Sequence, residues 1–458
     1  MTKLWGSRFQ SATDKLADQF SFSISYDHKL AWYDVVGSLA HAKMLGKQGI
    51  IPKSDSAKIV KGLTQIKTRI EQGRFAYNPA EEDIHSQIQS DLKKLIGAAA
   101  DKLHAARSRN DLIALDMKLY CRDHIVQIGG LLEILQEAIV DCAQKYQSVI
   151  IPAYTHLQAA QLISAAHHLL AYVEMIERDK SRLIDCAMRL DQMPLGSCAL
   201  SGTSLPIDRG FVAKELGFSS VTRNSMDSVS DRDFIIELLA DLAIVAMHFS
   251  RIAEDMILWA SSEFKFIDID WSLCTGSSIM PHKKNPDILE LIRGETATLY
   301  SNLNQVLVLM KGLPLTYNRD MQLDKPALFE SVEKVQLMIP LLVKLFATLT
   351  FNQAAIQKRV AADESLYSVD LMEHLIRNGV SYREAHDAVG EIVKKCLDQG
   401  QSISGLSLKE LQKFHKSFKE EALKILRPEI SVNLKTSEGS TGRASITSQI
   451  SFWKKYLK

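Results

Sequence analysis

The stretch "LLADLAIVAMHF" (residues 238–249) has apolar side chains on nearly every side of the helix that its spacing predicts. The stretch "LNQVLVLM" (residues 303–310) has the same character. A helix without a polar face must be buried on all sides. Since the helices of one chain cannot easily cover each other in this way, we expect a homo-oligomer whose helices merge into one core. A larger monomeric bundle is the alternative.

Helical periodicity extends over five stretches that are much longer than an average helix of about three turns. They cover residues 110–146, 156–193, 230–262, 285–311 and 320–350. Glycine and proline cluster between them, and no run of alternating strands is visible, so the sequence predicts an all-α fold. Long helices with short connections favour a bundle.

The two ends of the chain differ from its middle, because their helices are shorter and amphipathic. We therefore predict three domains: an N-terminal helical domain (1–105), a central long-helix bundle (106–355) and a C-terminal helical domain (356–458). In the first of these, residues 54–73 form one amphipathic stretch, with Ser54 as the expected N-cap and Gly73 at its end.

The composition excludes several classes of protein. The 458 residues contain 55 Lys plus Arg and 54 Asp plus Glu, so no lasting attraction to nucleic acid or to a membrane surface is expected. No apolar run reaches membrane-spanning length, and the first residues lack the apolar core of a secretory signal. The six cysteines contain no Cys-x-x-Cys pair, which favours a reducing, cytoplasmic setting and argues against a zinc site.

The loop "CTGSSIMPHKKNPDILELIRGET" (residues 274–296) concentrates hydroxyl and basic side chains before a helix. Asn285 is the expected N-cap, with Pro286 at the first helical position. The helix N-terminus and the basic side chains of residues 282–284 suit an anion such as a dicarboxylate. Ser277 could act as a base only if cations and N–H groups stabilise its alkoxide. A surface loop with solvated lysines is the alternative.

"GSSIMPHKKNP" (276–286) resembles the signature of the fumarase, aspartase and argininosuccinate lyase superfamily. Further segments are similar to argininosuccinate lyases, in the same order and spacing: "LWGSRF" (4–9), "EEDIHS" (81–86), "HAARSRND" (104–111), "YTHLQAAQ" (154–161), "HHLLAYVEMIERD" (167–179), "NSMDSVSDRDF" (224–234) and "YNRDMQLDK" (317–325). The resemblance covers nearly the whole chain. It implies a helical homotetramer with a twenty-helix core, active sites assembled from three subunits, and neither cofactor nor metal.

The reaction that this resemblance implies is the reversible elimination of argininosuccinate to fumarate and L-arginine, a step of arginine biosynthesis. A proton next to a carboxylate is weakly acidic, so the carbanion must be stabilised as a dianion. The resemblance implies that Ser277 removes this proton and that Lys283 and Asn285 stabilise the dianion. It assigns protonation of the leaving nitrogen to His156, with Glu290 as its partner. Read alone, His156 fits an ordinary core or surface histidine better.

The remaining substrate-binding side chains are implied by the same resemblance. At the dicarboxylate end they are Ser108, Arg109, Asn110 and Thr155, and at the arginine end Ser23, Asp27, Asp83, Tyr317, Gln322 and Lys325. Arg109 can bind a carboxylate bidentately, although "RSRND" alone also fits an ordinary capped helix start. His85 fits a place behind the site. Arg232 is either a further anion contact or a partner of Asp231 or Asp233.

The chain departs from the family pattern at several positions. The family usually reads H-T-G-R-S-R-N-D-Q where this chain has Ala105, Ala106 and Leu112 in "HAARSRNDL". Leu323 stands where an acid is usual, and Ser7 where a glycine is usual. Because Ala106 replaces a flexible glycine, it is expected to stiffen the segment that binds the dicarboxylate.

Two other functions stay open. One is a sister lyase that releases fumarate from another N-succinyl adduct, such as an adenylosuccinate-type substrate. A nucleotide would need a phosphate-binding site, and the sequence has no glycine-rich loop suited to one. The other is a catalytically silent homologue with a structural role. The presence of Ser277, His156, Lys283 and Glu290 argues against it.

Overall fold

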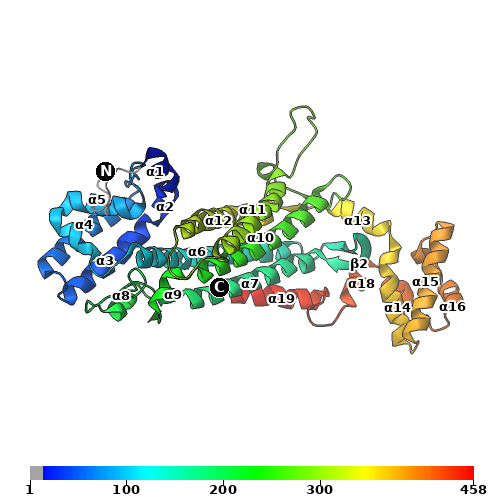
Figure 1. The fold of residues 1–458 in the computed structure, drawn as a ribbon. Coiled ribbons are helices and arrows are strands. Elements are labelled where there is room, and N and C mark those ends of the chain that lie inside the picture. Colours follow the sequence, from blue (N-terminus) through cyan, green and yellow to red (C-terminus); the bar gives the residue numbers. More distant parts are fainter. Residues whose placement is uncertain (1–13) are drawn as a thin grey trace. The chain divides into compact units, whose positions relative to one another are not determined.

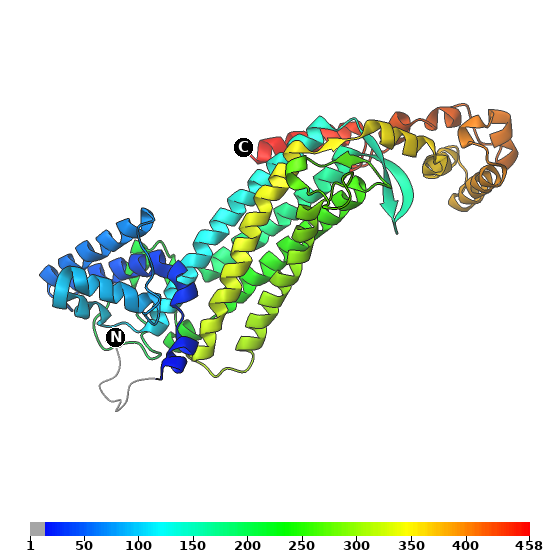
Figure 2. The same cartoon turned by 90° about the horizontal axis from the view of Figure 1, so that it is seen from above.

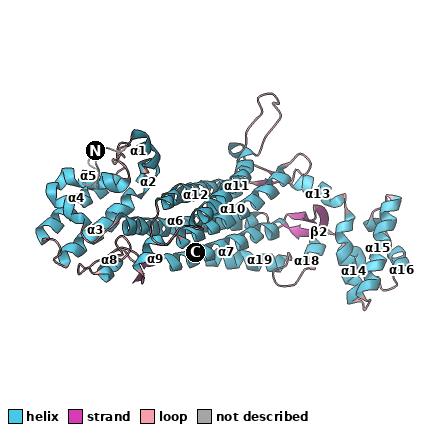
Figure 3. Cartoon of the chain, in the orientation of Figure 1, coloured by secondary structure: helices cyan, strands magenta, loops and turns pink. Residues whose placement is uncertain are grey.

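The structure is a computed structural model that describes residues 14–458, so "LWGSRF" and the departure at Ser7 lie outside the described residues. The predicted all-α class is confirmed. Helices make up most of the described chain, and its strands form only short pairs (Figure 3). In this part of the chain, no helix combines the length and apolarity needed to cross a membrane.

Five long helices dominate the described residues (Figure 1). They are α6 (Arg109–Lys145), α7 (Ala165–Leu190), α10 (Asp233–Ala260), α11 (Asp287–Met310) and α12 (Asp324–Thr348). Figure 2 shows these helices running alongside one another as a bundle. The five long helices predicted from periodicity are thus confirmed, although one of them begins later than expected.

The prediction of helix for residues 156–164 was wrong, because these residues belong to a β-hairpin. Strand β1 (Ile150–Thr155) pairs antiparallel with β2 (Gln158–Ser164). The turn residues His156 and Leu157 have φ of 53° and 57°, the left-handed conformation that reverses the chain. Helix α7 begins only after Ser164, whose Oγ accepts the N–H of Ala166 at 3.2 Å.

The chain divides into two compact units. Unit 1 contains the residues up to Gly129, Lys180–Ile244 and Ala297–Val335. Unit 2 contains Gly130–Asp179, Val245–Thr296 and Gln336–Lys458. Each of the five long helices contributes one part to each unit. The three-domain division of the sequence stays a prediction.

Unit 1 adds short elements to its parts of the long helices. They are α1 (Lys15–Ser21), α2 (Ile24–Asp27), η1 (His28–Leu30), α3 (Ala31–Lys47), α4 (Lys53–Glu71), α5 (Ile84–Ile96), η2 (Gly97–His104), β3 (Gln192–Met193), α8 (Arg209–Glu215), β4 (Ser220–Val221), α9 (Ser225–Ser230) and η4 (Arg319–Leu323). Helix α4 begins after Pro52, so Ser54 lies inside the helix and is not its N-cap. Pro52 takes the N-cap position instead, so the helix starts before the serine is reached.

In its described residues, unit 2 contains the C-terminal helices, the β1–β2 hairpin and two further short strands. The elements are β1, β2, β5 (Ile267–Asp268), η3 (Trp271–Leu273), β6 (Thr350–Phe351), α13 (Gln353–Ala361), η5 (Glu364–Tyr367), α14 (Ser368–Arg377), α15 (Tyr382–Gln399), η6 (Ile403–Gly405), α16 (Leu408–Phe414), α17 (Glu421–Ile425), α18 (Pro428–Asn433) and α19 (Arg443–Tyr456). Helices α14 to α17 share a buried cluster that includes Leu375, Ile392 and Phe418.

The two apolar stretches that predicted an oligomer differ in their burial. On α10, Leu238, Leu242 and Phe249 are each 0% exposed, so the chain itself already covers this helix. On α11, Leu307 and Val308 are 46% and 51% exposed. Of these two stretches, only the one on α11 therefore leaves apolar side chains exposed that a second copy could cover.

Candidate active site

A cavity of about 170 Å³ in unit 1 brings together residues from distant parts of the chain. Its lining consists of Ser23, Asp27, Glu82, Asp83, His85, Arg109, Asn110, Ile113, Tyr317, Arg319, Gln322 and Lys325. All six side chains expected to bind the substrate's arginine end are in this set. Both acidic and basic side chains line the cavity, which is therefore suited to a ligand that carries both charges.

Two buried aspartates are held in place on one side of the cavity. Ser23 Oγ donates to Asp27 Oδ2 at 2.5 Å, and Asp27 Oδ1 accepts the N–H of Ile84 at 3.1 Å. Burial raises the pKa of Asp27 above its usual value. Asp83 is the N-cap of α5 and accepts the N–H of Ser86 at 2.7 Å. Both carboxylates are thus fixed by hydrogen bonds before any ligand arrives.

Arg109 lies at the start of α6 and faces two acids. Its Nη1 is 3.2 Å from Asp83 Oδ2 and 3.5 Å from Glu82 Oε2, and its Nη2 donates to Ser86 Oγ at 2.6 Å. Burial opposes ionisation of Asp83, but the charges of His85 and Arg109 outweigh burial and hold the pKa of Asp83 below its usual value. The cavity therefore keeps Asp83 negative at neutral pH.

The sequence interpretation missed two charged side chains of this cavity, Glu82 and Arg319. Arg319 Nη2 donates to Glu82 Oε1 at 3.1 Å and to the Ser21 carbonyl at 2.9 Å. Gln322 Nε2 donates to the same carbonyl at 3.1 Å. The available signal was position: Glu82 lies next to Asp83, and Arg319 lies between Tyr317 and Gln322 in the same motif.

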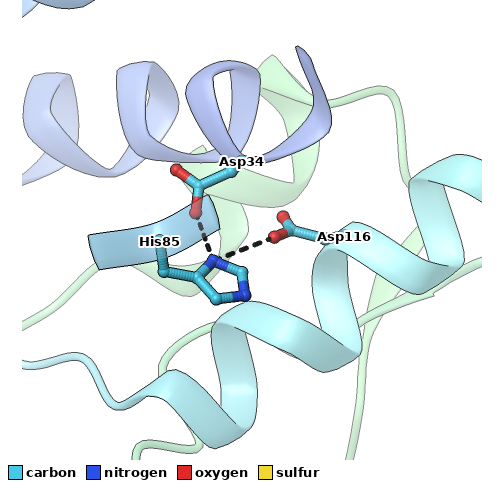
Figure 4. A group of neighbouring side chains, drawn as sticks. All are labelled: Asp34, His85 and Asp116. Carbon is cyan, nitrogen blue, oxygen red and sulfur yellow. Dashed lines mark hydrogen bonds and ion pairs between the residues drawn. The ribbon is translucent and has the colours of Figure 1, made fainter. Parts of the chain in front are cut away.

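Behind the cavity lies a buried layer of Asp34, His85 and Asp116 (Figure 4). His85 Nδ1 is 2.5 Å from Asp34 Oδ2 and 3.7 Å from Asp116 Oδ2. Burial opposes a charged imidazole, but the hydrogen bond to Asp34 and the nearby carboxylates outweigh it and raise the pKa of His85. Burial raises the pKa of Asp116 well above its usual value.

This layer is the group of side chains best placed to bind a cation in the described part of the chain, since their ligand atoms lie within 4.8 Å of one another. The raised pKa of His85 favours the imidazolium, which cannot bind a metal ion.

The segment before α6 holds the proposed dicarboxylate residues. Ala106 has φ of 55°, in the left-handed region. Ser108 Oγ accepts the N–H of Asn110 at 3.3 Å, which confirms the predicted helix start. Asp111 accepts the N–H groups of Ser108 at 2.9 Å and of residues 196 and 198. Burial nevertheless raises the pKa of Asp111 to about 6.

Arg232 has a different partner from the two that were considered. Its Nε donates to Asp324 Oδ2 at 2.5 Å, and both side chains are fully buried. Asp324 also lies 3.4 Å from Lys325 Nζ. Toward Asp231, Arg232 donates only to the backbone carbonyl, at 2.7 Å. The ion pair joins α12 to the start of α10, which fixes Lys325 at the cavity.

In unit 2, the loop with Ser277 extends away from the N-terminal end of α11 (Figure 1). Ser277 Oγ accepts the N–H of Met280 at 3.1 Å. Lys283 is exposed, whereas Lys284 is ion-paired with Asp268 at 2.9 Å. Ser277 thus already receives a backbone N–H, as an alkoxide would need.

The predicted cap of α11 was wrong by one residue. The helix begins at Asp287, so Pro286 precedes it. The backbone of Asn285 pairs with Thr275, through N···O distances of 3.0 and 2.8 Å. This bridge closes the loop at its base and replaces the capping role expected of Asn285.

The expected catalytic residues His156 and Glu290 and the expected substrate-binding residue Thr155, all in unit 2, are exposed. Thr155 and His156 lie at the tip of the β1–β2 hairpin, and Glu290 lies in the first turn of α11. Among the described residues, no hydrogen bond or ion pair joins His156 to Glu290 or to Ser277. A single chain therefore presents these groups without joining them.

Comparison with known proteins identifies the family. Residues 7–299 match a lyase family, and residues 366–433 match the C-terminal domain of argininosuccinate lyase. The argininosuccinate lyase of Sulfurihydrogenibium sp. (strain YO3AOP1) is 48% identical over 455 residues, 99% of each chain. The chain belongs to the argininosuccinate lyase family. The argininosuccinate lyase of Geobacter metallireducens is 46% identical over 448 residues, 98% of each chain.

Solved structures agree with this membership of the argininosuccinate lyase family. EDDS lyase in complex with formate has a TM-score of 0.83 at 26% identity, over 98% of this chain and 91% of that one. The class II fumarase of Schistosoma mansoni has a TM-score of 0.77 at 17% identity, over 90% of this chain and 93% of that one, and it shows the shared fold. The predicted family and its carbon–nitrogen lyase class are confirmed.

The departures from the argininosuccinate lyase pattern occupy different environments. Leu112 is 1% exposed, so an apolar side chain suits its site on α6. The carbonyl of Ala105 lies 2.9 Å from His41 Nε2, a contact that needs no side chain. Leu323 is 49% exposed. Of the described departures, only Ala106 brings a strained backbone with it.

Proposed function

We propose that this protein catalyses the reversible elimination of argininosuccinate to fumarate and L-arginine, in arginine biosynthesis and in the cytoplasm. The cavity of unit 1 is the observation that carries the proposal. Its aspartates, Asp27 and Asp83, suit the cationic end of the substrate, and Arg109 and Lys325 suit its carboxylates. Tyr317 and Gln322 are placed for neutral hydrogen bonds, as in the sequence interpretation.

The chemistry requires one proton to leave carbon and one to reach nitrogen. Ser277 removes the proton, the carbon–nitrogen bond breaks, and the electron pair forms the double bond of fumarate. Lys283 and Asn285 stabilise the intermediate dianion, and His156, oriented by Glu290, protonates the leaving nitrogen. The N–H of Met280 at Ser277 Oγ supports the role of the serine, because the same contact stabilises an alkoxide.

We further propose that the protein is a homotetramer whose active sites are shared between subunits. The exposed apolar side chains of α11, Leu307 and Val308 among them, support a second copy along this helix. Among the described residues of one chain, no hydrogen bond or ion pair joins His156 to Ser277, which supports sites completed by neighbouring subunits. The three helical domains, 1–105, 106–355 and 356–458, belong to the same proposal.

Fumarate absorbance after addition of argininosuccinate to the purified protein tests the reaction, with adenylosuccinate in parallel. Release of fumarate and arginine from argininosuccinate alone is the expected result. Release from adenylosuccinate would favour the sister lyase. A folded tetramer that acts on neither substrate would favour the silent homologue.

Two substitutions test the assigned roles. Ser277→Ala and His156→Asn should each reduce turnover by at least about a hundredfold and leave folding intact, because each removes one proton-transfer group. Ser262→Ala and His386→Asn replace exposed residues outside the proposed site and should retain activity. Mixing the two inactive variants should restore part of the activity. Failure to do so in verified mixed tetramers would argue against shared sites.

A further inference from the structure

The carboxylate of Glu82 lies between two arginines of the cavity. Its Oε1 accepts from Arg319 Nη2 at 3.1 Å, and its Oε2 is 3.5 Å from Arg109 Nη1. The Glu82 side chain is only 11% exposed, whereas that of Arg319 is 52% exposed. The backbone carbonyl of Glu82 accepts the N–H of Ser23 at 2.9 Å, which fixes the residue at the wall of the cavity.

Both terminal nitrogens of Arg109 already have partners among the described residues. Its Nη2 donates to Ser86 Oγ at 2.6 Å, and its Nη1 faces Asp83 Oδ2 at 3.2 Å as well as Glu82. A ligand carboxylate that binds both Nη atoms of this guanidinium must therefore compete with these internal contacts.

Glu82 is the acid that can move. Asp83 is tied to the N-terminus of α5 through the N–H of Ser86 at 2.7 Å and is 7% exposed. Among the described residues, the side chain of Glu82 forms ion pairs with Arg109 and Arg319 alone. The contact of Glu82 with Arg109, at 3.5 Å, is also longer than that of Asp83 with Arg109, at 3.2 Å. A rotation of the Glu82 side chain would free Arg109 and Arg319 without disturbing the helix cap.

We propose that Glu82 is a positioning residue that occupies the arginine pair Arg109 and Arg319 in the empty site, until a substrate carboxylate displaces it and its freed carboxylate pairs with the substrate's cationic end. The inference rests on the proposed function, since it assigns both charges to one substrate. No covalent step is involved. The two internal ion pairs of Glu82 are exchanged for ion pairs of both arginines and of Glu82 with the substrate.

This exchange makes Glu82 a determinant of specificity. A ligand with both a carboxylate and a guanidinium replaces every contact that it breaks. A plain dicarboxylate breaks the Glu82 contacts but offers the freed carboxylate nothing, so it binds more weakly. The site would thus bind argininosuccinate more tightly than a dicarboxylate such as succinate.

Glu82→Gln separates the two kinds of ligand. The amide keeps the shape of the side chain but loses its charge, so its hold on Arg109 and Arg319 weakens. Succinate binding, measured by calorimetry on the full-length protein, should tighten about three- to tenfold, the range of one partly exposed ion pair. The KM for argininosuccinate should rise by a similar factor. A purely structural role would move both values in the same direction.

Glu81→Gln is the matched control, because it removes the same charge from the neighbouring residue, which has no ion pair to either arginine in the described structure. It should change both values by less than about twofold. If Glu82→Gln fails to fold, Arg319→Gln replaces it, since this exposed side chain can be removed more safely. That variant should weaken succinate binding about threefold or more.

The outcomes distinguish this inference from the proposed function. If the wild type releases fumarate from argininosuccinate, but Glu82→Gln shifts succinate affinity and KM in the same direction or no more than Glu81→Gln does, the displacement idea is overturned and the reaction stands. If the wild type does not act on argininosuccinate, the proposed reaction is overturned, and unchanged succinate binding in Glu82→Gln would overturn the displacement as well.

Discussion

Ala106→Gly tests whether the segment before α6 stores backbone strain. Ala106 has φ of 55°, and the left-handed conformation costs a residue with a Cβ about 1–2 kcal/mol. Glycine avoids this cost. It also makes the unfolded chain more flexible, which opposes the gain by about 0.4–1 kcal/mol. The net expectation is that the free energy of unfolding rises by about 0.5–1 kcal/mol.

Ala105→Gly is the control for the unfolded state. Ala105 has φ of −57° and ψ of 132°, where alanine is unstrained. Only the flexibility of the unfolded chain then acts, and the free energy of unfolding should fall by about 0.4–1 kcal/mol. Because both variants change the unfolded chain alike, the difference between them isolates the strain, about 1–2 kcal/mol.

Urea unfolding followed by circular dichroism measures this difference. The protein concentration must be the same for all variants, because the stability of an oligomer depends on it. The slope of the free energy against urea must also be unchanged, so that midpoints can be compared. Equal destabilisation by the two substitutions would refute the strain at Ala106.

Three further variants test packing and buried charge by the same urea assay. Gly46→Ala places a Cβ 2.4 Å from a side-chain oxygen of α4 and should lower the free energy of unfolding by about 1–3 kcal/mol. Its control Gly390→Ala, with open space around it, should stabilise α15 by about 0.5–1 kcal/mol. Equal effects of the two substitutions would contradict the crowding at Gly46. Burial lowers the pKa of His104 to about 3, so below about pH 6.5 the unfolded state binds the proton first and stability falls as the pH falls. His104→Gln should reduce this loss by about 1.4 kcal/mol per pH unit down to about pH 3, and an unchanged pH slope would contradict the assignment. Asp116→Asn should lower the free energy of unfolding by about 1 kcal/mol or less, since burial already raises the pKa of this carboxyl. Asp34→Asn removes the closer partner of the His85 imidazole and should cost about 3–5 kcal/mol. The reverse order of the two costs would exclude Asp34 as the main stabilising partner of His85.

The long helices could be predicted because their signal is local. Periodicity alone gave residues 110–146, and α6 spans Arg109–Lys145. The hairpin could not be found in this way, because β2 is defined by pairing with β1 and by a left-handed turn. The apolar residues of 156–164 are compatible with either structure, and the pairing decided between them.

The cavity could be predicted only through the resemblance to a family. Taken alone, Ser23, Asp83 and Tyr317 are common residues far apart in the chain, and no spacing rule joins them. Glu82 and Arg319 were missed because their importance lies in an ion pair across 237 positions of sequence. Asn285 shows the opposite error, since its cap pattern is real but pairing with Thr275 prevailed.

The division of the chain into two units separates the residues proposed to bind the arginine end of the substrate from those proposed to transfer protons. The cavity lining belongs to unit 1, whereas His156 and Ser277 belong to unit 2, on a hairpin tip and an extended loop. Mutations could therefore retune which adduct is accepted while the proton-transfer apparatus stays intact. Such an arrangement lets one fold diversify its substrates by changing one module at a time.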